Sequence, residues 1–422
     1  MYQRATLPNG LRVICETMPH VHSVSLGVWV GSGSRYESQH YNGISHFIEH
    51  MFFKGTGRRT AKQIAETIDA VGGQLNAFTT KEYTCFYAKV LDQHFKMGID
   101  LLADMVTDSL FAPEDIEKEK QVVLEEIKSF EDSPDELIHD LFSYSVLKGH
   151  PLGMTILGTP ESVAKIDTAA IRDHLKHHYT PDNIVFAVAG NVQFDQILPE
   201  IEKSFATLQG KNEPKLDVLP ELKPEVILRT KDTEQVHLCL GTRGVCRESP
   251  DKYPVYVLDS LLGGSVSSRL FQQLREERGL VYVTGSNHSS YMDTGIFTIY
   301  AGMSLKNFEE VVVLIKQELH KLQQELISEQ EITRAKDQLK GNLLLSLESS
   351  CNRMSRIAKN ELFHDQLLTP EESVAKIESV TREDILRITR EIFEDNRLVI
   401  AAIGPFPADA KLYRKPYHEY KY

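Results

Sequence analysis

Short stretches of the chain alternate hydrophobic with small or polar residues, as a strand does when one of its faces is buried. The stretches that we expect to form strands are Leu11–Cys15, Val21–Val30, Tyr83–Val90, Val236–Leu240 and Gly295–Tyr300. Longer stretches repeat apolar residues with the helical period. These are Thr60–Val71, Phe95–Leu110, Val311–Leu326 and Glu329–Leu347. Strands interleaved with paired helices predict an α+β fold, in which helices pack on mainly antiparallel sheets.

The chain carries the same short motif twice, about half its length apart. Thr159–Asp167 reads TPESVAKID, and Thr369–Glu378 reads TPEESVAKIE. Each motif is followed by a helix-like stretch, an asparagine near a turn, and a buried-strand pattern, IVFAVAG or LVIAAIG. The asparagines, Asn183 and Asn396, are 396 − 183 = 213 residues apart, and half of the 422 residues is 211. An ordered series at one offset predicts two homologous domains that arose by duplication.

The join between the two copies is expected where the composition changes. Residues 208–224 read LQGKNEPKLDVLPELKP, which is rich in proline and lysine and has no helical periodicity. This composition is typical of an exposed linker. We therefore expect domains at 1–208 and 225–422, joined by a linker at 209–224.

The composition narrows the class of protein. With 41% hydrophobic and 25% charged residues, the chain is expected to be globular rather than disordered or fibrous. Its 47 basic and 60 acidic residues give a net charge of −13, which disfavours nucleic acid and is compatible with basic ligands. The five scattered cysteines make no disulfide framework. We see neither a signal-peptide core nor an apolar run of the ~20 residues that cross a membrane. We therefore expect a cytoplasmic protein that does not contact membranes.

One helical stretch carries a candidate metal site. Gly43–Lys54 reads GISHFIEHMFFK, and its two histidines, His46 and His50, would lie on one face of a helix. Imidazole nitrogens in this arrangement suit Zn²⁺. Glu49 projects near the same face, where it could act on a water instead of binding the metal; this is the H-x-x-E-H arrangement. Chance alone would produce roughly 0.09 such motifs in a chain of this composition. The alternative is a pair of surface histidines beside an unrelated carboxylate.

The helix expected after Pro113 carries two carboxylates in its apolar stripe. The stripe consists of Ile116, Val123, Ile127 and Phe130. Glu119 and Glu126 fall on it, and carboxylates in a buried stripe are costly unless they meet a cation or a metal. Two histidines leave a zinc site short of a third protein ligand, which one of these glutamates could supply. The other could hold the second ring N–H of a ligand histidine. The alternative for both is a solvated helix face.

HFIEH followed by EKEKQVVLEEI resembles the inverted zincins of the pitrilysin/insulinase family of metallopeptidases. The chain is most similar to short bacterial zinc peptidases that resemble the β-subunit of mitochondrial processing peptidase. The similar segments extend over nearly the whole chain: LPNGLRV near the start, Gly72–Tyr87, HPLG at 150–153, Tyr179–Asn191 and Ser267–Tyr282. The resemblance implies two α+β halves and a zinc-dependent peptidase.

The resemblance also implies a role for each residue of the candidate site. It implies that His46, His50 and Glu126 bind zinc and that Glu49 is the general base. It places Glu119 behind the ligands, in contact with one of them.

Outside the metal site, the resemblance points to residues that meet the substrate. Asn76, Ala77 and Phe78 would lie on an edge strand that receives the peptide backbone by strand addition. In the second half, Arg275 and Tyr282 match a pair that reaches the substrate. Without the resemblance, Arg275 would be interpreted as part of a solvated helix end and Tyr282 as a core aromatic.

These observations predict a zinc-dependent endopeptidase that hydrolyses unfolded, possibly basic, peptides inside a chamber. Two halves per chain would need a second chain to close such a chamber, so we expect a homodimer. One alternative is a non-catalytic scaffold subunit, and another is a processing-peptidase-like subunit that needs a different partner. A metal-dependent hydrolase that acts on something other than peptides is a third.

Overall fold

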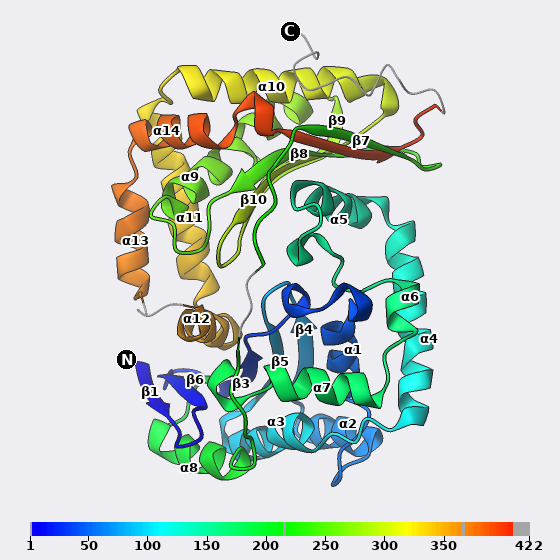
Figure 1. Ribbon diagram of the computed structural model, residues 1–422. Coiled ribbons are helices and arrows are strands. Elements are labelled where there is room, and N and C mark those ends of the chain that lie inside the picture. Colours follow the sequence, from blue (N-terminus) through cyan, green and yellow to red (C-terminus); the bar gives the residue numbers. More distant parts are fainter. Residues whose placement is uncertain (1, 214–216, 364–367, 408–422) are drawn as a thin grey trace. The chain divides into compact units, whose positions relative to one another are not determined.

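The computed structural model describes the chain except for residues 1, 214–216, 364–367 and 408–422 (Figure 1). It contains two compact units, and neither is continuous in sequence. The first unit comprises Met1–Lys128, Met154–Asp217 and Ser346–Leu368. The second comprises Ser129–Gly153, Val218–Leu345 and Thr369–Tyr422.

The first unit contains a six-stranded sheet in the order β1-β2-β6-β3-β5-β4. Its strands are β1 (Tyr2–Thr6), β2 (Arg12–Thr17), β3 (Ser23–Val30), β4 (Gln74–Thr79), β5 (Thr84–Leu91) and β6 (Ile184–Gly190). The β2–β6 pair is parallel, and the other neighbouring pairs are antiparallel. Within the described chain, β4 pairs with β5 alone and is therefore an edge strand.

Helices bury this sheet on both faces. The helices of the first unit are α1 (Ile44–Met51), α2 (Ala61–Asp69), α3 (Phe95–Asp108), the first part of α4 (Pro113–Asp132), α6 (Pro160–Val163), α7 (Thr168–His178), α8 (Phe194–Ser204) and α12 (Ser350–Phe363). On β3, Leu26 and Val28 point into the main core, whereas Trp29 points to the opposite face and packs with α12. The alternation along Val21–Val30 predicted a half-buried strand. That prediction is wrong for β3, because α12 covers its second face.

The second unit contains a five-stranded sheet in the order β7-β11-β8-β10-β9. Its strands are β7 (Glu225–Thr230), β8 (Val236–Gly244), β9 (Val281–Ser290), β10 (Gly295–Met303) and β11 (Val399–Gly404). The β7–β11 pair is parallel, and the other neighbouring pairs are antiparallel. The helices of this unit are α5 (Pro134–Val146), α9 (Lys252–Leu262), α10 (Phe308–Gln324), α11 (Glu329–Ser346), α13 (Pro370–Ser379) and α14 (Arg382–Ile392).

The two sheets repeat one topology, as the duplicated sequence motif predicts. Without β1, the first order is β2-β6-β3-β5-β4, and the second sheet has the corresponding strands in the same places, including its parallel pair. The motif itself starts a helix in both units. Thr159 and Thr369 each accept a hydrogen bond from the backbone N–H three residues later, and a proline follows each of them. The predicted α+β fold with two homologous domains is confirmed.

Each unit includes one helix from the other half of the sequence. Helix α5 packs against β8 and β11 of the second unit, and α12 packs against β2, β3 and β6 of the first. The apolar face of α5, with Ile138 and Phe142, is buried there in the second unit's sheet. The chain also passes from the first unit to the second between Asp217 and Val218, inside the stretch that we expect to be a linker. The units thus differ from the contiguous ranges 1–208 and 225–422 by the exchange of these helices.

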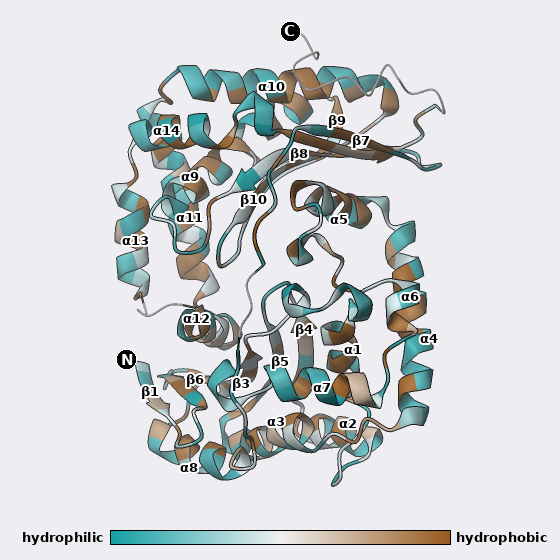
Figure 2. Cartoon of the chain, in the orientation of Figure 1, coloured by the Kyte–Doolittle hydropathy of each residue, from teal (hydrophilic) through white to brown (hydrophobic). Residues whose placement is uncertain are grey.

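The distribution of hydropathy agrees with these layers. In the second sheet, β11 is coloured as hydrophobic, whereas hydrophobic and hydrophilic residues alternate along α4 and α10, as in amphipathic helices (Figure 2). No described helix combines the length and the apolar character that crossing a membrane requires.

Candidate metal centre

The H-x-x-E-H residues lie on α1, a short helix held in the main core of the first unit. Phe47, Ile48 and Met51 are buried in that core, as the apolar face of the motif predicts. Anchoring by this face leaves the two histidines side by side on another, with their ring centroids 4.6 Å apart.

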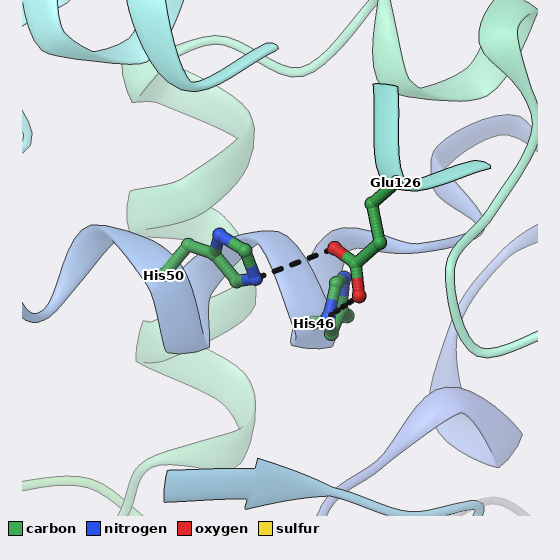
Figure 3. A group of neighbouring side chains, drawn as sticks. All are labelled: His46, His50 and Glu126. Atoms are coloured by element: carbon green, nitrogen blue, oxygen red, sulfur yellow. Dashed lines mark ion pairs between the residues drawn. The ribbon is translucent and has the colours of Figure 1, made fainter. Parts of the chain in front are cut away.

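Helix α4 brings a carboxylate to both histidines. Glu126 Oε1 lies 3.7 Å from His46 Nε2, and Glu126 Oε2 lies 3.7 Å from His50 Nε2 (Figure 3). The three residues each offer one ligand atom within 4.8 Å of the other two. They therefore face one point in space, although Glu126 is 76 residues further along the chain than His50 (126 − 50 = 76).

This donor set fits zinc. Two imidazole nitrogens and one glutamate oxygen are a ligand set of catalytic zinc sites, which keep a further position open for water or substrate. A metal needs the neutral form of the imidazole. Burial, and next the neighbouring His50, lower the pKa of His46 to about 4. At neutral pH His46 is therefore uncharged and available as a ligand.

Glu119 lies behind the second histidine. It is buried, and its Oε1 lies 2.8 Å from His50 Nδ1. Burial acts to raise the pKa of Glu119, but hydrogen bonds from His50 and Lys54 outweigh it and hold the pKa below its usual value. An ionised Glu119 accepts the Nδ1–H of His50 and so assigns the free electron pair to Nε2, the atom that faces Glu126.

Lys54 is a part of this arrangement that the sequence analysis did not single out. Its Nζ lies 2.6 Å from Glu119 Oε2, so it neutralises a carboxylate that is otherwise buried. The sequence could have indicated Lys54, because it follows His50 by four residues and would lie near the same helix face, at the end of the same motif.

Glu49 is held by a residue that the sequence analysis also missed. Thr79, the last residue of β4, donates a hydrogen bond from Oγ1 to Glu49 Oε2 at 2.5 Å. Burial raises the pKa of Glu49, and the bond from Thr79 partly opposes that rise. A raised pKa suits a carboxylate that must take up a proton and later release it.

Asn76, Ala77 and Phe78 lie on the edge strand β4, in register with Tyr87, Phe86 and Cys85 of β5. Asn76 is exposed at this edge, and its Oδ1 accepts the backbone N–H of Ala77 at 2.8 Å. The ring of Phe78 instead packs edge-on against Trp29, with centroids 5.7 Å apart. A role of Phe78 in substrate binding would therefore use its backbone.

Arg275 and Tyr282 belong to the second unit and lie beside each other. The guanidinium carbon of Arg275 is 4.8 Å from the ring centroid of Phe271 and 5.9 Å from that of Tyr282. Tyr282 is 72% exposed, so it is not the core aromatic that the sequence alone allowed. Contacts with two aromatic rings restrict Arg275 more than a solvated helix end would.

Comparison with known proteins places the chain in a family. Residues 12–160 match the insulinase family (peptidase family M16), and residues 165–339 match the family described as the peptidase M16 inactive domain. The second match agrees with the lack of an H-x-x-E-H motif in the second half of the sequence.

Relatives that match nearly the whole chain support the same family assignment. The chain is 44% identical over 405 residues to the uncharacterized zinc protease YmxG of Bacillus subtilis, a match that covers 96% of this chain and 98% of the relative. It is 38% identical over 411 residues to an uncharacterized zinc protease of Streptomyces coelicolor, covering 96% and 89%. The crystal structure of a protease from Helicobacter pylori has the same fold, with a TM-score of 0.89 at 22% identity over 96% of this chain and 99% of the other. The chain therefore belongs to the insulinase family of peptidases, family M16, and is a zinc-dependent peptidase.

Proposed function

We propose that the chain is an endopeptidase that cleaves unfolded peptides, with zinc held by His46, His50 and Glu126 and with Glu49 as the general base. The observation that carries this proposal is the meeting of three ligand atoms within 4.8 Å, one from each of the three ligands. Glu49 lies on the same helix as the two histidines, but it is not one of the three residues that meet there, and its Oε2 accepts a hydrogen bond from Thr79.

Each residue near the metal has a task that its contacts support. Zinc, when bound, would act as a Lewis acid that polarises the scissile carbonyl and lowers the pKa of a water to about 7. Thr79 holds one oxygen of Glu49, which leaves the other to accept a proton from the attacking water. Glu49 then donates that proton to the leaving amine nitrogen. Glu119 keeps His50 in the orientation that presents Nε2.

The substrate would bind through its backbone. An edge strand offers unpaired N–H and C=O groups, to which an extended peptide can add as a further strand. Within the described chain β4 is such an edge, and its last residue contacts the general base. This mode favours unfolded peptides, because a folded protein offers few extended segments. For Arg275 and Tyr282 we propose that they hold the peptide or stabilise the oxyanion of the transition state.

The first test separates metal binding from catalysis. Glu49→Gln should retain one zinc per chain, measured by metal analysis, and lose cleavage of an unfolded reporter peptide. Glu126→Gln should lose both zinc and cleavage. Glu125→Gln is the matched control, because Glu125 is an exposed neighbour on α4 that pairs with Lys128. Normal cleavage by Glu49→Gln would refute its role as the base.

The assembly and the location of the protein are also proposals. We propose a homodimer that encloses the peptide in a chamber in the cytoplasm, with a preference for basic peptides in keeping with the net charge of −13. Light scattering of the purified chain tests the dimer, and a fully active monomer would refute it. If the chain alone binds zinc but cleaves nothing until another protein is added, the processing-peptidase-like alternative is correct instead.

A further inference from the structure

A buried carboxylate outside the metal motif contacts the start of the zinc helix. Glu37 is only 5% exposed, and it lies six residues before the N-cap residue of α1, Gly43. Its Oε2 accepts the backbone N–H of Gly43 at 2.7 Å, and its Oε1 accepts the backbone N–H of Ser45 at 2.8 Å. The amide of Asn42 donates a third hydrogen bond to Oε2, at 2.9 Å. All three hydrogen bonds to Glu37 therefore come from the N-cap residue of α1 or from residues within two positions of it.

The start of α1 needs this acceptor. The first N–H groups of a helix have no partner within the helix, and a side chain at the N-cap position usually supplies one. Here the N-cap residue is Gly43, which has no side chain. Its φ of 93° and its closeness to the loop exclude another residue, because a Cβ would lie 2.6 Å from the carbonyl oxygen of Leu157. A carboxylate from outside the helix replaces the missing cap, and its charge suits the positive end of the helix.

The same turn is tied to α6 and to the loop that precedes it. Asn42 donates a second hydrogen bond to the carbonyl of Thr155 at 2.9 Å, and its own carbonyl accepts the hydroxyl of Ser162 at 2.7 Å. Glu37 thus binds the start of α1 next to Asn42, which is itself hydrogen-bonded to Thr155 and Ser162 of the first unit.

The two histidines differ in the hydrogen bonding of their Nδ1 atoms. The ring of His50 is oriented by Glu119, which bonds its Nδ1 at 2.8 Å. Among the described residues, by contrast, the buried Nδ1 of His46 has no hydrogen-bond partner. The position of His46 therefore depends on the backbone of α1, and His46 comes directly after Ser45, the residue whose N–H Glu37 accepts.

We propose that Glu37 is a positioning residue of the metal centre: by capping α1 it fixes His46 in the place where it can bind zinc. The inference rests on the proposed assignment of zinc to His46, His50 and Glu126. Hydrogen-bonding partners behind metal ligands typically contribute 10–100-fold to metal affinity. Because Glu37 acts through the backbone and on one ligand, we expect a loss of about tenfold, at the low end of that range.

The experiment compares two buried carboxylates of the first unit. Glu37→Gln keeps the size of the side chain but removes its charge and turns one acceptor into an N–H₂ donor, which cannot accept the N–H groups of α1. Glu16→Gln is the control, because Glu16 is 7% exposed on β2 and pairs with Arg353, away from the motif. Zinc dissociation constants of the full-length variants are measured by competition with a chromophoric chelator. Thermal unfolding of the chelator-treated proteins measures the general loss of stability.

The expected result is a zinc dissociation constant raised about tenfold in Glu37→Gln and by less than twofold in Glu16→Gln, at a comparable loss of stability. The absorption of bound Co²⁺ gives a second readout, since the visible bands of Glu37→Gln should change if His46 no longer coordinates. Equal zinc affinity of the two variants, with an unchanged Co²⁺ spectrum, would overturn the inference.

Two further variants make every outcome decisive. If Glu37→Gln does not fold, Asn42→Ala replaces it, because it removes one hydrogen bond to the same carboxylate. A rise of at least threefold in the zinc dissociation constant supports the inference, and an unchanged constant overturns it. His46→Ala tests the proposed function separately: if it binds zinc as tightly as the wild type, the assignment of the metal site itself fails, whatever Glu37 does.

Discussion

Replacement of Met354 by alanine should loosen α12 from the first sheet, and the chain contains its own reporter of that change. Trp29 is the single tryptophan of the sequence, and it is fully buried on β3. Its Nε1 donates a hydrogen bond to the sulfur of Met354 at 3.1 Å. Met354 is itself 1% exposed, so the shorter side chain would leave a cavity directly beside the indole.

The size of the effect follows from burial and from the lost hydrogen bond. Truncation of a buried methionine to alanine costs about 2–5 kcal/mol of unfolding free energy. The indole N–H, left buried without its partner, adds about 1 kcal/mol. A total of about 3–6 kcal/mol lowers the urea midpoint of the first unit by about 1–2 M, if the m-value is about 3 kcal/mol per M.

Trp29 fluorescence measures both consequences in one titration. We expect a lower urea midpoint for Met354→Ala and, without urea, emission shifted to longer wavelength because water reaches the indole. Met292→Ala is the control, since Met292 is 38% exposed in the second unit and its loss should change stability by less than about 0.5 kcal/mol. Equal midpoints and equal emission for the two variants would show that α12 does not anchor on Trp29.

Three further predictions concern the site and the second unit. Glu119→Gln should weaken zinc binding about 10–100-fold in chelator competition, because His50 loses the carboxylate that orients it; an unchanged affinity would contradict that role. Thr79→Val should lower kcat without changing the zinc content, and Thr79→Ser, which keeps the hydroxyl donor to Glu49, should restore it. Burial raises the pKa of Asp259 from 3.8 to about 6, against the opposing hydrogen bond from Ser286. Because the folded state then binds the proton more tightly than the unfolded state, Asp259 lowers the stability of the second unit as the pH rises from about 4 to 6. The free energy of unfolding, measured with urea at pH 4 and at pH 7, should therefore fall less between the two pH values in Asp259→Asn than in the wild type. An equal fall in the wild type and the variant would refute the reasoning.

Much of the candidate site was predictable because its signals are local. His46, Glu49 and His50 lie within one helix, so their spacing alone places them together once the helix forms. The buried stripe of α4 likewise follows from its periodicity, and Glu119 is buried on it as expected. The residues that hold this site in place were harder to predict. Glu37 and Thr79 stand on a turn and at a strand end, where no periodic pattern marks them.

The amino-acid sequence by itself determined the fold class, the duplication and the chemistry of the metal motif, because periodicity, a repeated motif and ligand spacing are properties of neighbouring residues. Apart from the family resemblance, only the tertiary structure decided that Glu126 faces both histidines and that Glu119 lies behind His50. It alone showed that α5, from the first half of the sequence, packs on the sheet of the second unit, and that α12, from the second half, packs on the sheet of the first unit. These outcomes depend on contacts between residues far apart in the chain: 69 positions separate His50 from Glu119, and 325 separate Trp29 from Met354. The residues near each partner in the sequence do not encode these pairings. They form only when separate helices and strands pack against each other and bury their apolar faces.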